Sequence, residues 1–174
     1  GNEERFDRFF IDPDIPRECQ PKSTGTYKNG GKPSYDRGHI LGANAFDYSQ
    51  AAMYQSNLML NVVPQISSIN RNGSWREVEE RIECMRTPKY IGDGRSLTTI
   101  AGVIWGDDVS DDYFIKSHGQ RTPSKLFKIV LEKNPSGVKS YAWVFPNDRL
   151  EKGHVNVDDY LVSPEYIENL SGYQ

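Results

Sequence analysis

The sequence is poor in cysteine, in histidine and in long apolar runs, and it has no excess of positive charge. Its two cysteines, Cys19 and Cys84, fit no zinc-binding spacing, and a single disulfide and two free thiols both stay open. The longest apolar stretches, such as residues 100–105, have the length of a strand and fall far short of the roughly 20 residues that cross a membrane. A formal net charge of −3 excludes a polybasic protein that binds nucleic acid through bulk charge.

The chain does have the composition of a folded domain. It contains 174 residues, of which 36% are apolar and 11% aromatic, which is enough to build a core without disulfides or a structural metal. We expect a single domain over residues 1–174, with a loop-rich segment over residues 1–30 that proline and glycine interrupt. The chain starts at Gly1 without the pattern of a signal peptide, and we interpret it as a trimmed or mature form.

Hydrophobic patterning predicts several strands and fewer helices. Strands are predicted for apolar runs rich in Val, Ile and aromatic residues, at residues 58–63, 97–105, 126–131 and 141–145. One clear helix is predicted between the first two runs, from apolar residues at helical spacing, namely Trp75, Val78, Ile82 and Met85. Shorter helices are expected over residues 45–54 and 163–172. This pattern predicts an α+β domain with a central, mainly antiparallel sheet flanked by helices.

The run Asp36-Arg37-Gly38-His39 brings together residues that suit phosphodiester chemistry. Histidine has an ordinary pKa near neutrality, so His39 can take a proton from water at physiological pH. Arg37 presents a fork of donors that matches phosphate oxygens, and Gly38 permits a close approach of the backbone. A base beside a phosphate-binding guanidinium predicts the hydrolysis of a phosphodiester.

Asparagines in the following segment allow two interpretations. Asn61 shortly precedes Pro64-Gln65, and Asn70 lies just before the predicted helix. Both are ordinary turn and capping residues, and Asn70 stands where a helix cap would stand. The alternative is that the amide oxygen of Asn70 binds a hard cation such as Mg²⁺, which keeps most of its waters and accepts one or two protein oxygens.

Together these segments resemble the DNA/RNA non-specific endonuclease family, the ββα-metal nucleases of the endonuclease G type. The family signature is an Asp-Arg-Gly-His run, an Asn shortly before Pro-Gln, an Asn five residues after that Gln, and a Trp followed four residues later by a Glu. The matching residues are Asp36 to His39, Asn61, Asn70, Trp75 and Glu79. The resemblance covers roughly residues 30–174. It implies a ββα-metal, or His-Me finger, motif with strands around His39 and a helix over residues 70–85.

On the strand side, the resemblance implies a role for each residue of the motif. His39 is expected to be the general base that activates a water molecule, and Asn61 to help fix its ring, since one ring nitrogen must be held for the other to act. Arg37 is expected to bind a phosphate oxygen. Asp36 and Gly38 are expected to have structural roles.

On the helix side, the resemblance implies that Asn70 is the direct protein ligand of Mg²⁺, with Mn²⁺ as an alternative, and that Glu79 holds metal-bound waters. Trp75 is expected to have a structural role. Trp75 and Glu79 each lie one residue further from Asn70 than the family pattern has them. On a regular helix of about 100° per residue, Glu79 would then lie nearly opposite Asn70, whereas Glu77 would lie on the same face as Asn70. Either an irregularity at Asn72-Gly73 absorbs the extra residue, which we favour, or Glu77 holds the waters.

Basic residues cluster in two segments, which indicates local contacts with a polyanion. Residues 16–40 hold five basic against two acidic side chains, and residues 116–133 hold five against one. Within these segments, candidates for contacts with the phosphates of a substrate are Arg17, Lys22 and Arg121.

Two histidines and an acidic stretch outside the motif carry a weaker signal. His118 and His154 have no partner motif, and we expect surface or hydrogen-bonded side chains. Residues 107–112 contain four aspartates but lack the Gly and Glu placement of a Ca²⁺-binding loop. We therefore expect a solvated acidic loop there.

The resemblance predicts a Mg²⁺-dependent, sugar-non-specific endonuclease that hydrolyses DNA and RNA to 5′-phosphate ends. The main alternative is a catalytically silent protein of the same fold that binds nucleic acid or a protein partner, and a second is a phosphodiesterase for small nucleotides. The expected partners are DNA and RNA, with no membrane. Members of the family are often dimers, but the sequence has no exposed apolar stripe that marks an interface, so a homodimer stays open. A secreted or organellar location is favoured over the cytosol.

Overall fold

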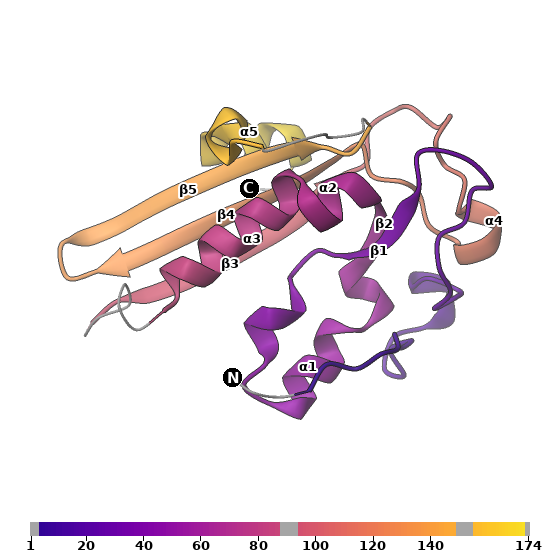
Figure 1. Cartoon of the computed structure of the whole chain (residues 1–174), viewed down its shortest axis with the longest axis horizontal. Coiled ribbons are helices and arrows are strands. Elements are labelled where there is room, and N and C mark those ends of the chain that lie inside the picture. Colours follow the sequence, from indigo (N-terminus) through magenta and orange to yellow (C-terminus); the bar gives the residue numbers. More distant parts are fainter. Residues whose placement is uncertain (1–3, 88–93, 149–154, 173–174) are drawn as a thin grey trace. The chain divides into compact units, whose positions relative to one another are not determined.

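The computed structural model describes residues 4–87, 94–148 and 155–172 (Figure 1). The chain forms two compact units, and each unit combines two separate stretches of sequence. Unit 1 comprises residues 1–67 and 105–123, and unit 2 comprises residues 68–104 and 124–174. The single-domain organisation stays a prediction. Within the described residues, no helix has the length and apolar content that crossing a bilayer requires.

The centre of unit 1 is an antiparallel strand pair, β1 (Tyr35–His39) and β2 (Val62–Ile66). All residues of β2 are buried, as its apolar run indicates. The strand predicted over residues 58–63 begins later than expected, because a 3-10 helix, η3 (Met59–Asn61), precedes β2. The pairing aligns His39 with Val62 and thereby fixes the register of the motif.

Short helices make up the rest of the regular structure of unit 1. They are η1 (Arg17–Cys19), η2 (Ala43–Phe46), α1 (Gln50–Ser56) and α4 (Ile115–His118). The helix predicted over residues 45–54 is therefore divided between η2 and α1. The division has a local cause, because Ser49 Oγ accepts a hydrogen bond from Ala52 N at 3.1 Å and caps a new helix.

Residues 6–10 pack along the chain that leads into β2. Phe10 forms an isolated parallel bridge with Leu58, and its backbone N donates to the carbonyl oxygen of Asn57 at 3.0 Å. The ring of Phe10 also lies 4.6 Å from that of Tyr54, measured between centroids. The N-terminal segment is therefore part of the packed structure of unit 1.

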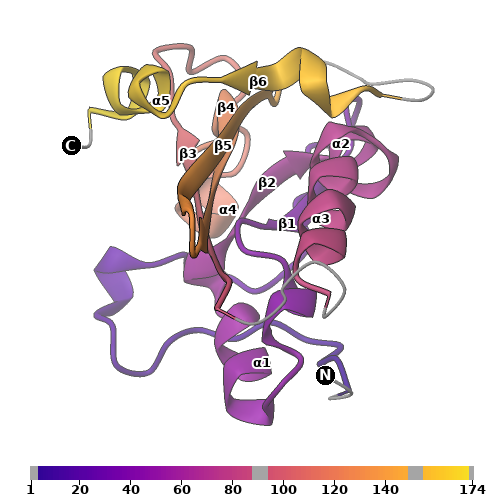
Figure 2. The same ribbon diagram turned by 90° about the vertical axis from the view of Figure 1, so that its left-hand side faces the viewer.

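Unit 2 is built on a four-stranded antiparallel sheet in the order β3-β4-β5-β6 (Figures 1 and 2). The strands are β3 (Ser96–Ile104), β4 (Lys125–Asn134), β5 (Gly137–Pro146) and β6 (Leu161–Val162), and η4 (Val157–Tyr160) precedes β6. The predicted strands at residues 97–105, 126–131 and 141–145 correspond to β3, β4 and β5. The last two extend further because they continue into a hairpin.

Helices cover both faces of this sheet (Figure 2). On one face, Trp75 of α3 (Ser74–Met85) meets Phe145 edge to face, with ring centroids 5.7 Å apart. On the other, Ile167 of α5 (Pro164–Ser171) packs with Phe127 and Ala142. The α+β architecture with an antiparallel sheet flanked by helices is thus confirmed.

The helical segment after β2 is divided into two helices. α2 (Ser67–Asn72) ends before Gly73, whose extended backbone (φ −110°, ψ −158°) separates it from α3. The irregularity that was favoured at this position is therefore confirmed. Asn70 lies inside α2 and Gly73 is the N-cap of α3, so the interpretation of Asn70 as a helix cap is wrong.

The last helix, α5, has the boundaries that its sequence predicts. Ser163 Oγ accepts a hydrogen bond from Tyr166 N at 3.1 Å, and Pro164 occupies the first helical position. Gly172 ends the helix in the left-handed region, at a φ of 71°.

Candidate active site

Alternation along β1 places Arg37 and His39 on one face of the strand and Asp36 and Gly38 on the other. Gly38 lies against the side chain of Gln65 on the neighbouring strand. A Cβ at residue 38 would be 2.6 Å from the Cβ of Gln65, closer than two carbon atoms can approach. Glycine is therefore required here by packing, which agrees with a structural role for Gly38.

Asp36 connects β1 to the start of α2. Its Oδ1 accepts a hydrogen bond from Ser67 Oγ at 2.9 Å, and Ser67 N donates to the carbonyl oxygen of Ser34, also at 2.9 Å. β2 ends at Ile66 and α2 begins at Ser67, so no loop separates strand from helix. Asn70 lies one turn further along α2 and is half-buried. The chain thus has the order strand, strand, helix of a ββα motif.

The ring of His39 is held by Asn57. His39 Nε2 lies 3.0 Å from Asn57 Oδ1, and Asn57 Nδ2 donates to the carbonyl oxygens of Phe6 and Arg8 at 3.1 and 3.0 Å. Because these two bonds engage the amide nitrogen, the atom facing the ring is an oxygen, which can only accept. Nε2 therefore carries the hydrogen, and in the neutral ring Nδ1 is the nitrogen that carries the lone pair.

Asn61 holds the chain that follows His39. Its Oδ1 accepts from Leu41 N at 3.0 Å, and its Nδ2 donates to the carbonyl oxygens of Leu41 and Ser56, both at 2.9 Å. The side chain thus fixes the backbone two residues beyond His39, while the ring bond belongs to Asn57. Sequence reasoning missed Asn57, although it lies four residues before Asn61 and ends a helical run.

Arg37 is oriented by the N-terminal half of unit 1. Its Nη1 donates to the carbonyl oxygen of Thr24 at 2.8 Å, and its guanidinium carbon lies 4.3 Å from the centroid of the Phe9 ring. The same ring lies 5.3 Å from the imidazole of His39. Phe9 therefore contacts both residues of the motif, a role that its sequence did not indicate.

On α3, Glu79 lies on the side of the helix that faces β4. Lys128 Nζ is 3.4 Å from Glu79 Oε1 and 4.1 Å from the centroid of the Trp75 ring. The side chain of Lys128 is 2% exposed and that of Glu79 is 29% exposed. Burial lowers the pKa of Lys128 from its ordinary value, and the carboxylate of Glu79 acts in the opposite direction. Trp75 is fully buried, which agrees with a structural role.

The donor set on the helix side suits a strongly hydrated ion. In residues 4–87, 94–148 and 155–172, no three His, Cys, Asp or Glu side chains come close enough together to form a metal cage. An amide oxygen from Asn70, with a carboxylate from Glu79 to bind water, fits an ion that keeps most of its own waters. These residues are therefore chemically compatible with Mg²⁺ or Mn²⁺.

Among the basic residues proposed for substrate contacts, Arg17 and Arg121 form structural bonds through their side chains, and Lys22 through its backbone. Arg17 Nη2 donates to the carbonyl oxygen of Lys22 at 2.9 Å, and Lys22 N donates to that of His118 at 2.7 Å. Arg121 Nε donates to Asp112 Oδ2 at 2.8 Å, and its Nη2 bonds to backbone carbonyls of the acidic loop. Phosphate binding by Arg17, Lys22 and Arg121 stays a prediction.

The weaker candidates have ordinary surroundings. His118 is buried, with Ser117 Oγ 2.8 Å from Nδ1 and the carbonyl oxygen of Gly25 3.1 Å from Nε2, so the hydrogen-bonded interpretation is confirmed. His154 lies outside the described residues. In the acidic loop, Asp112 is mostly buried and binds Arg121, so not every carboxylate there is solvated. Cys19 and Cys84 are free and exposed.

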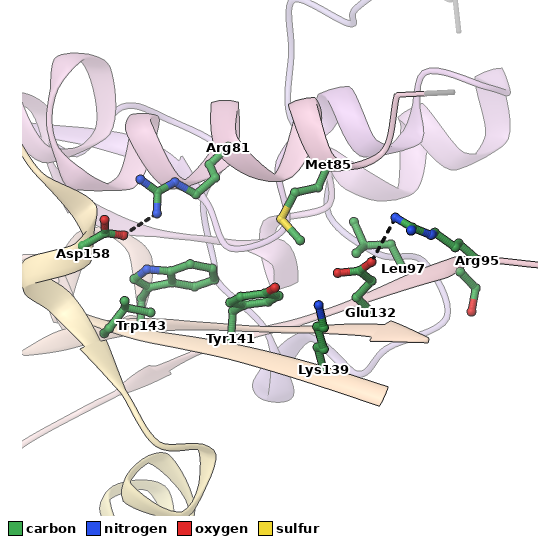
Figure 3. A pocket seen from close by; sticks show the side chains of 11 residues that line it. Arg81, Met85, Arg95, Leu97, Glu132, Lys139, Tyr141, Trp143 and Asp158 are labelled. Atoms are coloured by element: carbon green, nitrogen blue, oxygen red, sulfur yellow. Dashed lines mark hydrogen bonds and ion pairs between the residues drawn. The ribbon is translucent and has the colours of Figure 1, made fainter. Parts of the chain in front are cut away.

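A separate groove of about 450 Å³ lies in unit 2 between α3 and the sheet (Figure 3). Its base includes Tyr141 and Trp143, whose rings stack at 6.2 Å between centroids. Two ion pairs border it, Arg81 with Asp158 and Arg95 with Glu132. None of the sequence-predicted site residues lines this groove.

The fold of the chain defines its class. It resembles a chain in the solved structure of the EndoG/EndoGI complex, with a TM-score of 0.62, 19% sequence identity and coverage of 79% of this chain and 57% of that one. At this identity the likeness concerns the fold alone. The protein thus has the fold of a ββα-metal nuclease.

Sequence comparison gives the family. The chain is 26% identical to mitochondrial endonuclease G of Bos taurus, covering 99% of this chain and 57% of that protein. It is 27% identical to the mitochondrial nuclease EXOG of Homo sapiens (95% and 45%) and 28% identical to a nuclease of Nostoc (99% and 61%). The chain therefore spans about half the length of the curated relatives it matches. The profile of DNA/RNA non-specific endonucleases matches residues 1–174, and the chain belongs to this family.

The match also corrects the extent of the resemblance. It includes the first thirty residues, which lie outside the range of roughly 30–174 over which the sequence itself shows the resemblance. In the structure this segment contacts the motif, because the backbone carbonyls of Phe6 and Arg8 hold Asn57 and the ring of Phe9 contacts Arg37 and His39.

Proposed function

We propose that this chain is the nuclease part of a Mg²⁺-dependent endonuclease that hydrolyses phosphodiester bonds in DNA and RNA and leaves 5′-phosphate ends. The observation that carries the proposal is the contact of His39 with Asn57 beside Arg37. Membership of a nuclease family and the nuclease names of the relatives support it. Because the expected contacts are to phosphate and not to base edges, both DNA and RNA are suitable substrates.

His39 acts as the general base. Asn57 holds Nε2 in its protonated form, so Nδ1 is the nitrogen that takes a proton from the attacking water. Asn61 fixes the backbone beyond His39 and thereby limits movement of the residue. The ring of Phe9 against His39 further restricts its orientation.

Arg37 binds a phosphate oxygen of the substrate. One Nη1 hydrogen is directed to Thr24, while the rest of the guanidinium donors make no hydrogen bond within the described residues. The remaining N–H groups of the guanidinium can donate hydrogen bonds to a phosphate oxygen while the bond to Thr24 is kept. Anchoring by Thr24 and Phe9 orients these donors before the substrate arrives.

Asn70 and Glu79 serve the metal ion. When bound, Mg²⁺ supplies a Lewis acid that stabilises the negative charge developing on the phosphate and on the leaving 3′ oxygen. The amide oxygen of Asn70 would be the direct ligand of the ion, and the carboxylate of Glu79 would accept hydrogen bonds from its waters. The break at Gly73 favours Glu79 over Glu77, because the phase of one continuous helix no longer relates Asn70 to α3.

Digestion of supercoiled plasmid DNA and of ribosomal RNA tests this proposal. The purified protein is incubated with each substrate in Mg²⁺ and in EDTA, and the products are examined for 5′-phosphate by ligation. We expect both substrates to be cut in Mg²⁺ and neither in EDTA. Binding without cutting would favour the catalytically silent alternative, and a chromogenic diester cleaved faster than DNA would favour a phosphodiesterase for small nucleotides.

The proposal extends to partners and location. Nucleic acid is the substrate, and we propose a homodimer as the working assembly. The relatives named as mitochondrial support an organellar location, with secretion as the alternative.

A further inference from the structure

Lys128 is a buried cation that the proposed reaction does not yet use. It lies on β4, on the face of the sheet that α3 covers, and its side chain is 2% exposed. Burying an ammonium group is costly unless a counter-charge and hydrogen bonds compensate. Its Nζ lies near two groups of α3, the carboxylate of Glu79 and the ring face of Trp75.

The two oxygens of the Glu79 carboxylate have different surroundings. Oε1 lies 3.4 Å from Lys128 Nζ, whereas Oε2 makes no hydrogen bond within the described part of the chain. With 29% of its side chain exposed, Glu79 has one oxygen facing the interior cation and can offer the other to water. A carboxylate that is held at one oxygen presents the second in a fixed direction.

A second ion pair on the same helix provides a contrast. Arg76 and Glu80 lie on α3 one residue from Trp75 and Glu79, with side chains 56% and 55% exposed. Such an exposed i,i+4 pair contributes little and is weakened by salt. The Lys128–Glu79 pair differs because Lys128 is fully buried, so turning the carboxylate of Glu79 away would remove an anion from beside a cation inside the protein.

We propose that Lys128 is a positioning residue that holds Oε1 of Glu79 so that Oε2 accepts hydrogen bonds from the waters of the metal ion. This inference rests on the proposed function, in which Glu79 serves that ion. Lys128 itself touches neither substrate nor metal; it acts through Glu79. The stacking of Nζ on Trp75 fixes the ammonium against the helix that carries Glu79.

A double-mutant cycle on Mn²⁺ binding tests the inference. The four proteins are the wild type, Lys128→Met, Glu79→Gln and the double variant, and the dissociation constant is measured by the electron paramagnetic resonance of free Mn²⁺ without nucleic acid. We expect each single variant to weaken Mn²⁺ binding about tenfold, the low end for groups that orient metal ligands. The double variant should bind no more weakly than Glu79→Gln alone, because Lys128 acts only through Glu79.

A purely structural role predicts another pattern. The inference is wrong if Lys128→Met binds Mn²⁺ like the wild type, or if the two effects multiply in the double variant. The exposed pair supplies the matched control, since Arg76→Met and Glu80→Gln should leave the dissociation constant unchanged. Should Lys128→Met not fold, Lys128→Gln, which keeps a donor without the charge, replaces it in the same cycle and is judged by the same criteria.

Failure of the inference can be told from failure of the proposed function. A wild-type protein that neither binds Mn²⁺ nor cuts nucleic acid would contradict the proposed function. A wild type that does both, with Lys128 variants that bind Mn²⁺ equally well, would contradict the positioning role alone.

Discussion

At the scale of single residues, the most informative contact is the one between His39 and Asn57. A histidine serves as a base only when its second nitrogen is held in the right protonation state. Asn57 does this because its own amide nitrogen is committed to the carbonyls of Phe6 and Arg8. Three separate segments of unit 1 therefore determine which nitrogen of His39 is available.

Replacing Asn57 by alanine should reduce turnover without unfolding the protein. We expect kcat on plasmid DNA to fall about 10- to 100-fold, less than the 10² to 10⁴ lost with a general base itself. Asn29→Ala is the matched control, because Asn29 also donates its amide to a backbone carbonyl, and this bond, to Pro33, stays within one loop. Full activity of folded Asn57→Ala would show that the ring needs no such partner.

Phe9 supports a second prediction. Phe9→Leu keeps an apolar side chain but removes the ring face that contacts the guanidinium of Arg37, and we expect kcat/KM to fall about tenfold. Phe6→Leu is the control, since Phe6 packs on Phe10 and Tyr54. Equal effects of the two substitutions in steady-state kinetics would mean that Phe9 contributes only general packing.

The sequence indicates the side chains that we propose to react better than it indicates the side chains that hold them. Arg37 and His39 are identifiable because their types and spacing carry chemistry. Asn57 and Phe9 are common residue types, and their roles arise from contacts with residues far away in the sequence. Phe9, for example, meets its partners some thirty residues later, a relation that no local pattern encodes.

At the scale of elements, β1 and β2 depend on one close approach. Gly38 faces Gln65, and we expect Gly38→Ala to separate the strands or displace that side chain. The variant should melt several degrees lower, since about 1 kcal/mol shifts Tm by about 2–4 °C in a protein of this size. Gly31→Ala, where no atom lies within 4 Å of the new Cβ, is the control for calorimetry. A wild-type Tm for Gly38→Ala would contradict the close packing.

Element boundaries are predictable where local chemistry decides them. Ser163, Pro164 and Gly172 determine α5 through a cap, a fixed φ and a left-handed residue. The sequence predicts the start of β2 too early because Met59 and Leu60 are apolar yet belong to η3, and the register of β2 is set by its pairing with β1. The apolar residues at helical spacing predict helix α3. The contact of Glu79 with Lys128 on β4 depends instead on how the helix packs on the sheet, which the local sequence does not encode.

At the scale of the whole molecule, an excess of positive charge lies in two segments, residues 16–40 and 116–133, while the chain as a whole is negative. The formal net charge is −3, so binding to nucleic acid must come from a limited basic surface. We expect the affinity of His39→Ala for a DNA duplex, measured by fluorescence anisotropy in EDTA, to fall more than about tenfold between 50 and 200 mM salt. An affinity that does not change over this range would contradict a site that binds the phosphate backbone.

The central claim is that His39 is the general base of a metal-dependent nuclease, and His39→Ala tests it most directly. Cleavage of plasmid DNA in Mg²⁺ is measured for wild type and variant, with and without added imidazole, after both proteins are shown to melt alike. We predict that turnover falls about 10² to 10⁴ and that imidazole restores part of it, because the free base replaces the missing ring. Cleavage by His39→Ala at the wild-type rate without imidazole would contradict the account.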